Sequence, residues 1–153
     1  AGVVLSYDFN DNFTEEDIER IAPCISVGFF SCSHLGEVEI KLVLKKAVSL
    51  GCKIVIGTRG KESAIAYNGE KYFYEDIVNV KATDTMGAGD SFISAFLTNY
   101  LLAEADESMS ADSKITTSLK AANAYAATVV VKDGSLGVGY DVDPDRLSDI
   151  LNI

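Results

Sequence analysis

The sequence predicts an α/β fold, with a doubly wound, mostly parallel sheet flanked by helices and a small β-hairpin. Short apolar runs alternate with amphipathic segments through the first 56 residues. This strand–helix–strand order implies right-handed crossovers in a parallel sheet. Two long helical segments follow a hairpin-like pair of strands. In a fold of this class, ligands are expected at the carboxyl ends of the strands.

Three strands are predicted in the first half of the chain. Val3–Phe9, Cys24–Ser31 and Cys52–Ile56 are mostly apolar, which is typical of strands covered on both faces. Between the first two strands, Thr14 precedes a run of acidic residues and is the predicted N-cap of a helix that Pro23 ends. All three strands are therefore expected to be buried.

A further helix is predicted between the second and third strands. It runs from Glu37 to Leu50, and Gly51 follows as its C-terminal stop. Its lysines are expected in solvent, and its apolar face is expected to comprise Val38, Leu42, Val43, Ala47 and Leu50.

The second half begins with a predicted hairpin. Strands Ser63–Tyr67 and Lys71–Tyr74 flank Asn68-Gly69, a pair typical of a type I′ turn. A long helix is expected from Gly87 to about Ala103, and its scarce polar residues predict a central, buried position. A second long helix is expected from about Ser113 to Val131, where small alanines permit close approach of another helix or of a ligand.

Length and composition limit the class of protein. At 153 residues, with 48% apolar residues, the chain is one domain with enough material for a core. The net charge of −10 argues against nucleic acid and anionic membrane surfaces as partners. The three cysteines lack Cys-x-x-Cys spacing and are expected to be buried free thiols, as in the cytoplasm. No apolar stretch reaches transmembrane length. Near the end of the chain, Pro144 is expected to begin a short helix.

The most informative segment is Asp-Thr-Met-Gly-Ala-Gly-Asp at residues 84–90. The small residues Gly87, Ala88 and Gly89 let a phosphate approach the backbone at the start of a helix. Unpaired N–H groups and the helix dipole favour an anion there. Asp90 would lie beside that anion, where a carboxylate can take a proton from an attacking hydroxyl. The segment is neither a Walker A loop nor a dinucleotide-binding fingerprint.

Two other interpretations of this segment stay open. A Gly-Ala-Gly sequence can simply make a tight turn with room for helix packing. Gly89-Asp90-Ser91 is also similar to a block found in a family of serine esterases, in which Ser91 would be the nucleophile. That chemistry needs a histidine base, and the single histidine, His34, lies far upstream.

Segment 84–90 resembles the Asp-Thr-x-Gly-Ala-Gly-Asp signature of the ribokinase-like (PfkB) carbohydrate kinases. The resemblance implies ATP-dependent transfer of the γ-phosphate to a primary hydroxyl of a sugar or fructosamine-type substrate. Asp90 would be the base, and the N–H groups of Gly87, Ala88 and Gly89 would hold the transferring group.

The resemblance also predicts which part of a kinase this chain represents. Family members are longer, so residues 1–153 are expected to be the C-terminal nucleotide-binding and catalytic part, without the N-terminal half that supplies the sugar site and lid. Within the family, the segments Tyr7–Phe9 and Ser31–His34 look most like those of fructoselysine 6-kinases. Missing strands would expose an apolar sheet edge, so self-association, for instance as a homodimer, is expected.

Further site residues are implied by the same resemblance. Gly57-Thr58-Arg59-Gly60 matches a Gly-x-x-Gly element that contacts nucleotide phosphates in the family. Glu37 matches a glutamate that organises Mg²⁺ through water, although His34 replaces the family's asparagine. Asn123 would lie against the adenine of ATP. Asp84 would help to hold K⁺, together with backbone carbonyls that include the loop at residues 132–137.

Each of these positions also has a plain structural explanation. Gly57–Gly60 can be an ordinary β-turn, and Glu37 can be a first-turn acid favoured by the helix dipole. Asn123 can be a polar residue on a helix surface. A non-catalytic nucleotide-binding remnant therefore stays an alternative function.

Overall fold

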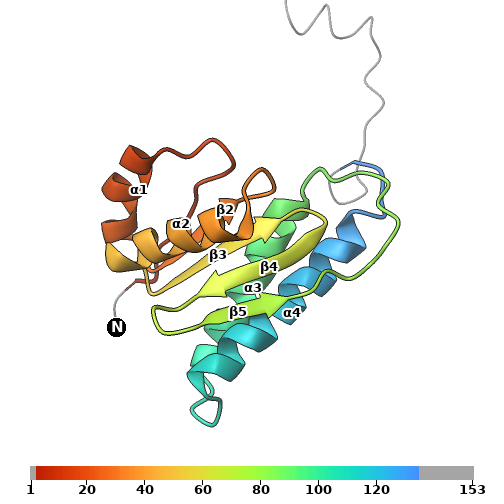
Figure 1. Ribbon diagram of the computed structural model, residues 1–153. Helices are drawn as coiled ribbons and strands as arrows, with labels where there is room; N and C mark the ends of the chain where they lie inside the picture. The colour runs from red at the N-terminus through yellow and green to blue at the C-terminus, as the bar shows by residue number, and fades with distance from the viewer. Residues whose placement is uncertain (1–2, 135–153) are drawn as a thin grey trace, which may run out of the picture.

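The computed structural model describes residues 3–134 and shows a five-stranded sheet with helices on both faces (Figure 1). The strands lie side by side in sequence order: β1 (Ser6–Asp8), β2 (Val27–Ser31), β3 (Ile54–Arg59), β4 (Glu62–Tyr67) and β5 (Tyr72–Glu75). β1, β2 and β3 are parallel, whereas β3–β4 and β4–β5 are antiparallel. The α/β class and the hairpin are confirmed, and the described sheet is mixed. The helix expected near Pro144 lies outside the described residues.

The helices divide between the two faces of the sheet (Figure 1). One face carries α1 (Glu15–Ile21), the short 3₁₀ turn η1 (Ala22–Cys24) and α2 (Glu37–Ser49), and the other carries α3 (Ala88–Glu104) and α4 (Ala111–Val129). This arrangement confirms the doubly wound prediction. Within the described residues, no helix is long and apolar enough to cross a membrane.

The central strands β2 and β3 are buried on both faces, as their apolar composition predicts. Successive residues of a strand point to opposite faces. Phe30 and Val55 pack with α2, whereas the neighbouring Phe29 and Ile56 pack with α3 and α4. The rings of Phe29 and Phe96 meet edge to face, with centroids 5.7 Å apart.

The first strand differs from its prediction. β1 contains three residues rather than seven, and Val3, Val4 and Leu5 before it are exposed. Among the described residues, β1 pairs only with β2, so it forms an edge of the sheet. An apolar run is buried only where another element covers it. The expected exposed sheet edge is therefore present, and self-association through it stays a prediction.

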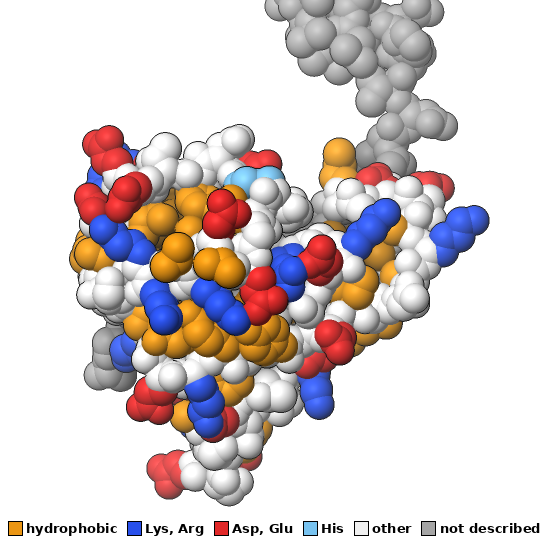
Figure 2. Space-filling model, viewed as in Figure 1, with side chains coloured by type: hydrophobic (Ala, Val, Ile, Leu, Met, Phe, Trp, Pro, Cys, Tyr) orange, Lys and Arg blue, Asp and Glu red, His pale blue; other side chains and the backbone are white. Residues whose placement is uncertain are grey.

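The apolar face predicted for α2 is also partly wrong. The buried positions are Ile40, Leu44 and Ala47, whereas Val38 is 73% and Leu42 is 63% exposed. The helical spacing allows either stripe to face the sheet, and the sequence does not show which one is covered. Hydrophobic side chains consequently gather on the outer surface over α2 and the β4–β5 hairpin (Figure 2).

The turn between β4 and β5 is not the predicted type I′ turn. Four residues, 68–71, join the strands, and among them only Gly69 has a positive φ, of 93°. A type I′ turn needs positive φ at both central residues. The Asn68 side chain instead accepts hydrogen bonds from the N–H groups of Glu70 and Lys71, at 3.0 and 2.9 Å. This side chain closes the longer turn.

Two expectations about burial need correction. α3 is not central: its Phe92 and Phe96 face the core, but Leu102 is 69% exposed because no described element covers that side.

Cys32 and Cys52 are buried free thiols as predicted, whereas Cys24 is exposed on η1. Burial raises the pKa of Cys32 to about 12, so this thiol stays protonated at neutral pH.

Replacing Thr14 with alanine tests the predicted N-cap of α1. The Thr14 hydroxyl oxygen accepts from the Asp17 N–H, and the Asp17 carboxylate accepts from the Thr14 N–H, both at 3.1 Å. Loss of this capping box is expected to lower the free energy of unfolding by about 1 kcal/mol, measured by urea denaturation. The control is Thr128→Ala, because the Thr128 hydroxyl only donates to a carbonyl within its own helix. Equal losses in both variants would contradict the cap.

Candidate active site

The start of α3 is shaped by a left-handed residue. Gly87 is the N-cap with φ of 76°, a conformation that glycine adopts without steric cost. Its carbonyl accepts the first helical hydrogen bond, from the Ser91 N–H at 2.9 Å. A side chain at residue 87 would therefore strain this backbone.

This helix start leaves backbone donors available. Among the described residues, the N–H groups of Gly87, Gly89 and Asp90 have no acceptor. The Ala88 N–H already donates to the Thr85 carbonyl at 3.2 Å. Helix N-termini with free N–H groups bind anions, because the helix dipole adds to the hydrogen bonds. The anion site predicted here therefore has three donors, and one of them, the Asp90 N–H, had not been assigned from the sequence.

A cavity of about 130 Å³ adjoins the start of α3. It lies between the β3–β4 turn, α3 and α4, and its lining includes six of the predicted site residues: Thr58, Arg59, Gly60, Ala88, Gly89 and Asn123. Positions 65 residues apart in the sequence thus meet at one site. Ala126, one of the small residues expected to permit close approach, and Ile77 also line the cavity. Ile77 was not a predicted site residue, because it lies in an irregular segment without a pattern.

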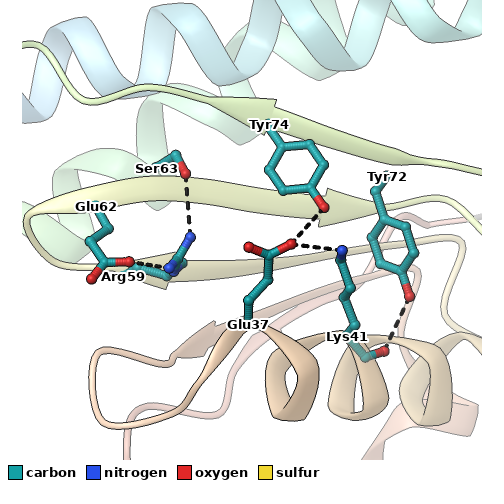
Figure 3. A network of polar contacts seen from close by, with 7 residues as sticks. All are labelled: Glu37, Lys41, Arg59, Glu62, Ser63, Tyr72 and Tyr74. Carbon is teal, nitrogen blue, oxygen red and sulfur yellow. Dashed lines mark hydrogen bonds and ion pairs between the residues drawn. The ribbon is translucent and has the colours of Figure 1, made fainter.

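Two polar lining residues already have partners. The Arg59 guanidinium forms an ion pair with Glu62 and donates to the Ser63 hydroxyl at 3.4 Å (Figure 3). Asn123 is 9% exposed, and its amide donates to the Asp76 carbonyl. These contacts fix both side chains at the wall of the cavity.

Gly57 lies apart from this cavity. It is buried in β3, and a Cβ there would lie 3.0 Å from Ile40 Cγ2 and 3.3 Å from Cys32 Sγ. Of the Gly-x-x-Gly element, Gly60, with φ of 63°, makes the turn into β4. The first glycine therefore allows close packing of α2 on the sheet.

Asp90 lies in the first turn of α3 and is exposed. Its carboxylate has no hydrogen bond to any described residue, so it is free to accept one from a ligand. Ser91 beside it is only 6% exposed. That burial argues against the esterase interpretation, which needs an accessible nucleophile.

Asp84 joins the segment before α3 to the segment after α4. Its carboxylate accepts from the N–H groups of Met86, at 2.9 Å, and Gly134, at 3.1 Å. The backbone N–H groups of Thr83 and Asp84 donate to the Val130 carbonyl at 2.7 and 3.2 Å. Residues 135–137 of the loop that was expected to contribute K⁺ ligands lie outside the described residues.

Glu37 begins α2, on the opposite face of the sheet from α3. One carboxylate oxygen accepts from the Lys41 ammonium at 2.7 Å and from the Tyr74 hydroxyl at 3.1 Å (Figure 3). Glu37 does not line the cavity. The described residues contain no group of three or more His, Cys, Asp or Glu side chains that could hold a metal. A single carboxylate with a free oxygen still fits Mg²⁺ that arrives on phosphates and keeps several waters.

Comparison with known proteins identifies the family. Residues 11–138 match the pfkB family of carbohydrate kinases, and the chain belongs to this family. It is 36% identical over 147 residues to the fructosamine kinase FrlD of Bacillus subtilis (strain 168), over 96% of this chain and 48% of that protein. It is 34% identical over 97 residues to the fructoselysine 6-kinase of Escherichia coli (strain K12), over 63% of this chain and 37% of that kinase.

Solved structures show the same fold. The chain superposes on the aminoimidazole riboside kinase of Salmonella enterica, in complex with aminoimidazole riboside and an ATP analogue, with a TM-score of 0.69. The identity is 22%, over 98% of this chain and 52% of that one. The ribokinase-like fold and the resemblance to fructoselysine 6-kinases are therefore confirmed. The chain spans about half the length, or less, of the curated relatives it matches.

Paired glycine substitutions separate packing from ligand approach. Gly57→Ala is expected to lower the free energy of unfolding by about 1–3 kcal/mol, because the added methyl group overpacks the contact with Ile40. Gly89→Ala places its methyl group where no heavy atom lies within 4 Å, so stability is expected to be unchanged while nucleotide affinity falls. Urea denaturation and nucleotide titration of both variants check this. The reverse pattern would contradict the two assignments.

Replacing Asp84 with alanine tests whether its carboxylate holds the two segments together. Loss of two charge-assisted hydrogen bonds is expected to destabilise this region by about 2 kcal/mol and to speed amide exchange at Met86 and Gly134. Nucleotide affinity is expected to fall. Asp106→Ala is the control, because it removes a similar contact to the Ser108 N–H in the α3–α4 loop. If both variants bind nucleotide like the wild type, Asp84 does not support the site.

Proposed function

We propose that this chain is the nucleotide-binding and catalytic part of an ATP-dependent carbohydrate kinase. The observation that carries the proposal is the start of α3, which has free N–H groups and an unpaired carboxylate and whose Ala88 and Gly89 line a cavity. Membership of the pfkB family supports it. The acceptor would be a primary hydroxyl of a sugar or fructosamine-type compound, as the names of the two curated relatives suggest.

Asp90 would act as the general base. It would accept the proton of the substrate hydroxyl while the hydroxyl oxygen bonds to the γ-phosphorus and the bond from that phosphorus to the bridging oxygen of ADP breaks. Negative charge on the transferring phosphoryl group would be held by the N–H groups of Gly87, Gly89 and Asp90. These donors are fixed before the reaction, so little reorganisation is needed when charge develops.

The nucleotide would occupy the cavity between the β3–β4 turn and α4. Its phosphates would lie toward Gly89 and the start of α3, with Thr58 and Arg59 offering a hydroxyl and a guanidinium from the facing turn. The adenine would lie toward Asn123 and Ala126. A small residue at position 126 leaves room for a flat ring.

Cations complete the proposed site. Mg²⁺, when bound, would neutralise charge on the phosphates, and Glu37 would hold it through water. Asp84 would hold K⁺ together with backbone carbonyls. Each oxygen of Asp84 already accepts one N–H, which leaves one lone pair on each for a cation.

Two buried free thiols support the cytoplasm as the location.

Replacing Asp90 with asparagine in the full-length protein tests the proposed base. Turnover of a fructosamine-type sugar, found by screening a sugar panel with ATP, is expected to fall by about 10²–10⁴-fold. Nucleotide affinity is expected to stay within about twofold, because asparagine keeps the shape of the side chain and the backbone donors. Steady-state kinetics and calorimetric titration measure the two effects.

Asp112→Asn is the matched control, since Asp112 is the first-turn acid of α4 and pairs with Lys71 away from the cavity. Its turnover should equal that of the wild type. A rate above about one tenth of wild type in Asp90→Asn would exclude Asp90 as the base. Nucleotide binding without turnover of any sugar would favour the non-catalytic remnant.

A further inference from the structure

Glu37 is held on one side by residues from two elements (Figure 3). Lys41 follows it by one turn of α2, and Tyr74 reaches it from the edge strand β5, 37 residues away in the sequence. The Lys41 ammonium also lies over the rings of Tyr72 and Tyr74, 5.3 and 5.5 Å from their centres. The Tyr72 hydroxyl donates to the Lys41 carbonyl at 3.3 Å. We call the two residues that contact the Glu37 carboxylate, Lys41 and Tyr74, the clamp.

The clamp engages only one of the two carboxylate oxygens. Both donors bind Oε1 of Glu37, and Oε2 has no partner among the described residues. Figure 3 shows this second oxygen on the side that faces Arg59, whose side chain lines the cavity. The carboxylate is therefore fixed at one oxygen and open at the other, toward the proposed nucleotide site.

The clamp contributes little to the stability of the fold. An exposed ion pair between residues one turn apart on a helix adds little to the free energy of unfolding. The contact from β5 is thus better explained by the orientation it gives to the carboxylate than by fold stability.

We propose that Tyr74 and Lys41 are positioning residues that orient Glu37 toward the divalent cation on the nucleotide phosphates. This inference rests on the proposed function. Side chains that hydrogen-bond a metal-ligating carboxylate fix its orientation, and losing one weakens metal binding. Neither residue touches the nucleotide or the sugar in this proposal, because both act through Glu37.

Two tyrosines on β5 provide a matched comparison. Tyr74→Phe removes the hydroxyl that binds Glu37, and Tyr72→Phe removes a hydroxyl that binds only a backbone carbonyl. Both variants keep the aromatic ring beside Lys41. The difference between them therefore reports the single contact to the carboxylate.

The experiment measures cation dependence of nucleotide binding in the full-length protein. Calorimetric titrations with a non-hydrolysable ATP analogue are made over a range of free Mg²⁺. Binding of Mn²⁺ in the presence of the analogue is followed by EPR. In Tyr74→Phe, the half-saturating concentration of either cation is expected to rise about tenfold, with unchanged analogue affinity at saturating cation. Tyr72→Phe should behave like the wild type, and Lys41→Met should shift in the same direction as Tyr74→Phe.

Three results would overturn the inference. The first is wild-type cation dependence in Tyr74→Phe, and the second is an equal shift in Tyr72→Phe. The third is wild-type cation dependence in Glu37→Gln, which would remove Glu37 from the metal site. None of these results contradicts the proposed kinase, because Asp90→Asn tests that function separately. Thermal unfolding of each variant shows that the fold is retained.

Discussion

Strands β2 and β3 are covered by helices on both faces, and this burial determines where the helices and loops around the sheet lie. Phe30 and Val55 need α2 on one side, and Phe29 and Ile56 need α3 and α4 on the other. The connections β1–α1–β2 and β2–α2–β3 join parallel strands in sequence order, and crossovers of one hand place α1 and α2 on the same face of the sheet. The start of α2, the β3–β4 turn and the start of α3 are then set by the ends of these strands, and the candidate site lies among them.

Local features of the site were predictable from the sequence because they depend on neighbouring residues. The free N–H groups at Gly87 and Gly89 follow from small residues at the start of a helix, and the positive φ of Gly87 follows from the same run. Features that depend on distant segments were not predictable. The contacts of Glu37 with Tyr74 and of Asp84 with Gly134 join residues 37 and 50 positions apart, and no periodicity records such pairs.

The errors in the predicted fold have a common physical cause. An apolar residue is buried only when another element covers it, and the sequence of one element does not say which of its faces is covered. Val38 and Leu42 had the same helical spacing as the buried Ile40 and Leu44. Val3–Leu5 had the composition of the buried strands but lie at the sheet edge.

The residues that line the cavity all come from one segment of the chain, and this has a consequence for how the protein can evolve. All of its lining residues lie between positions 58 and 126, within a single stretch that also contains Asp84 and Asp90. Under the proposed function, mutations outside this stretch would change the acceptor site without changing any residue that lines the cavity. The same fold occurs in proteins named for compounds as different as fructosamines and an imidazole riboside.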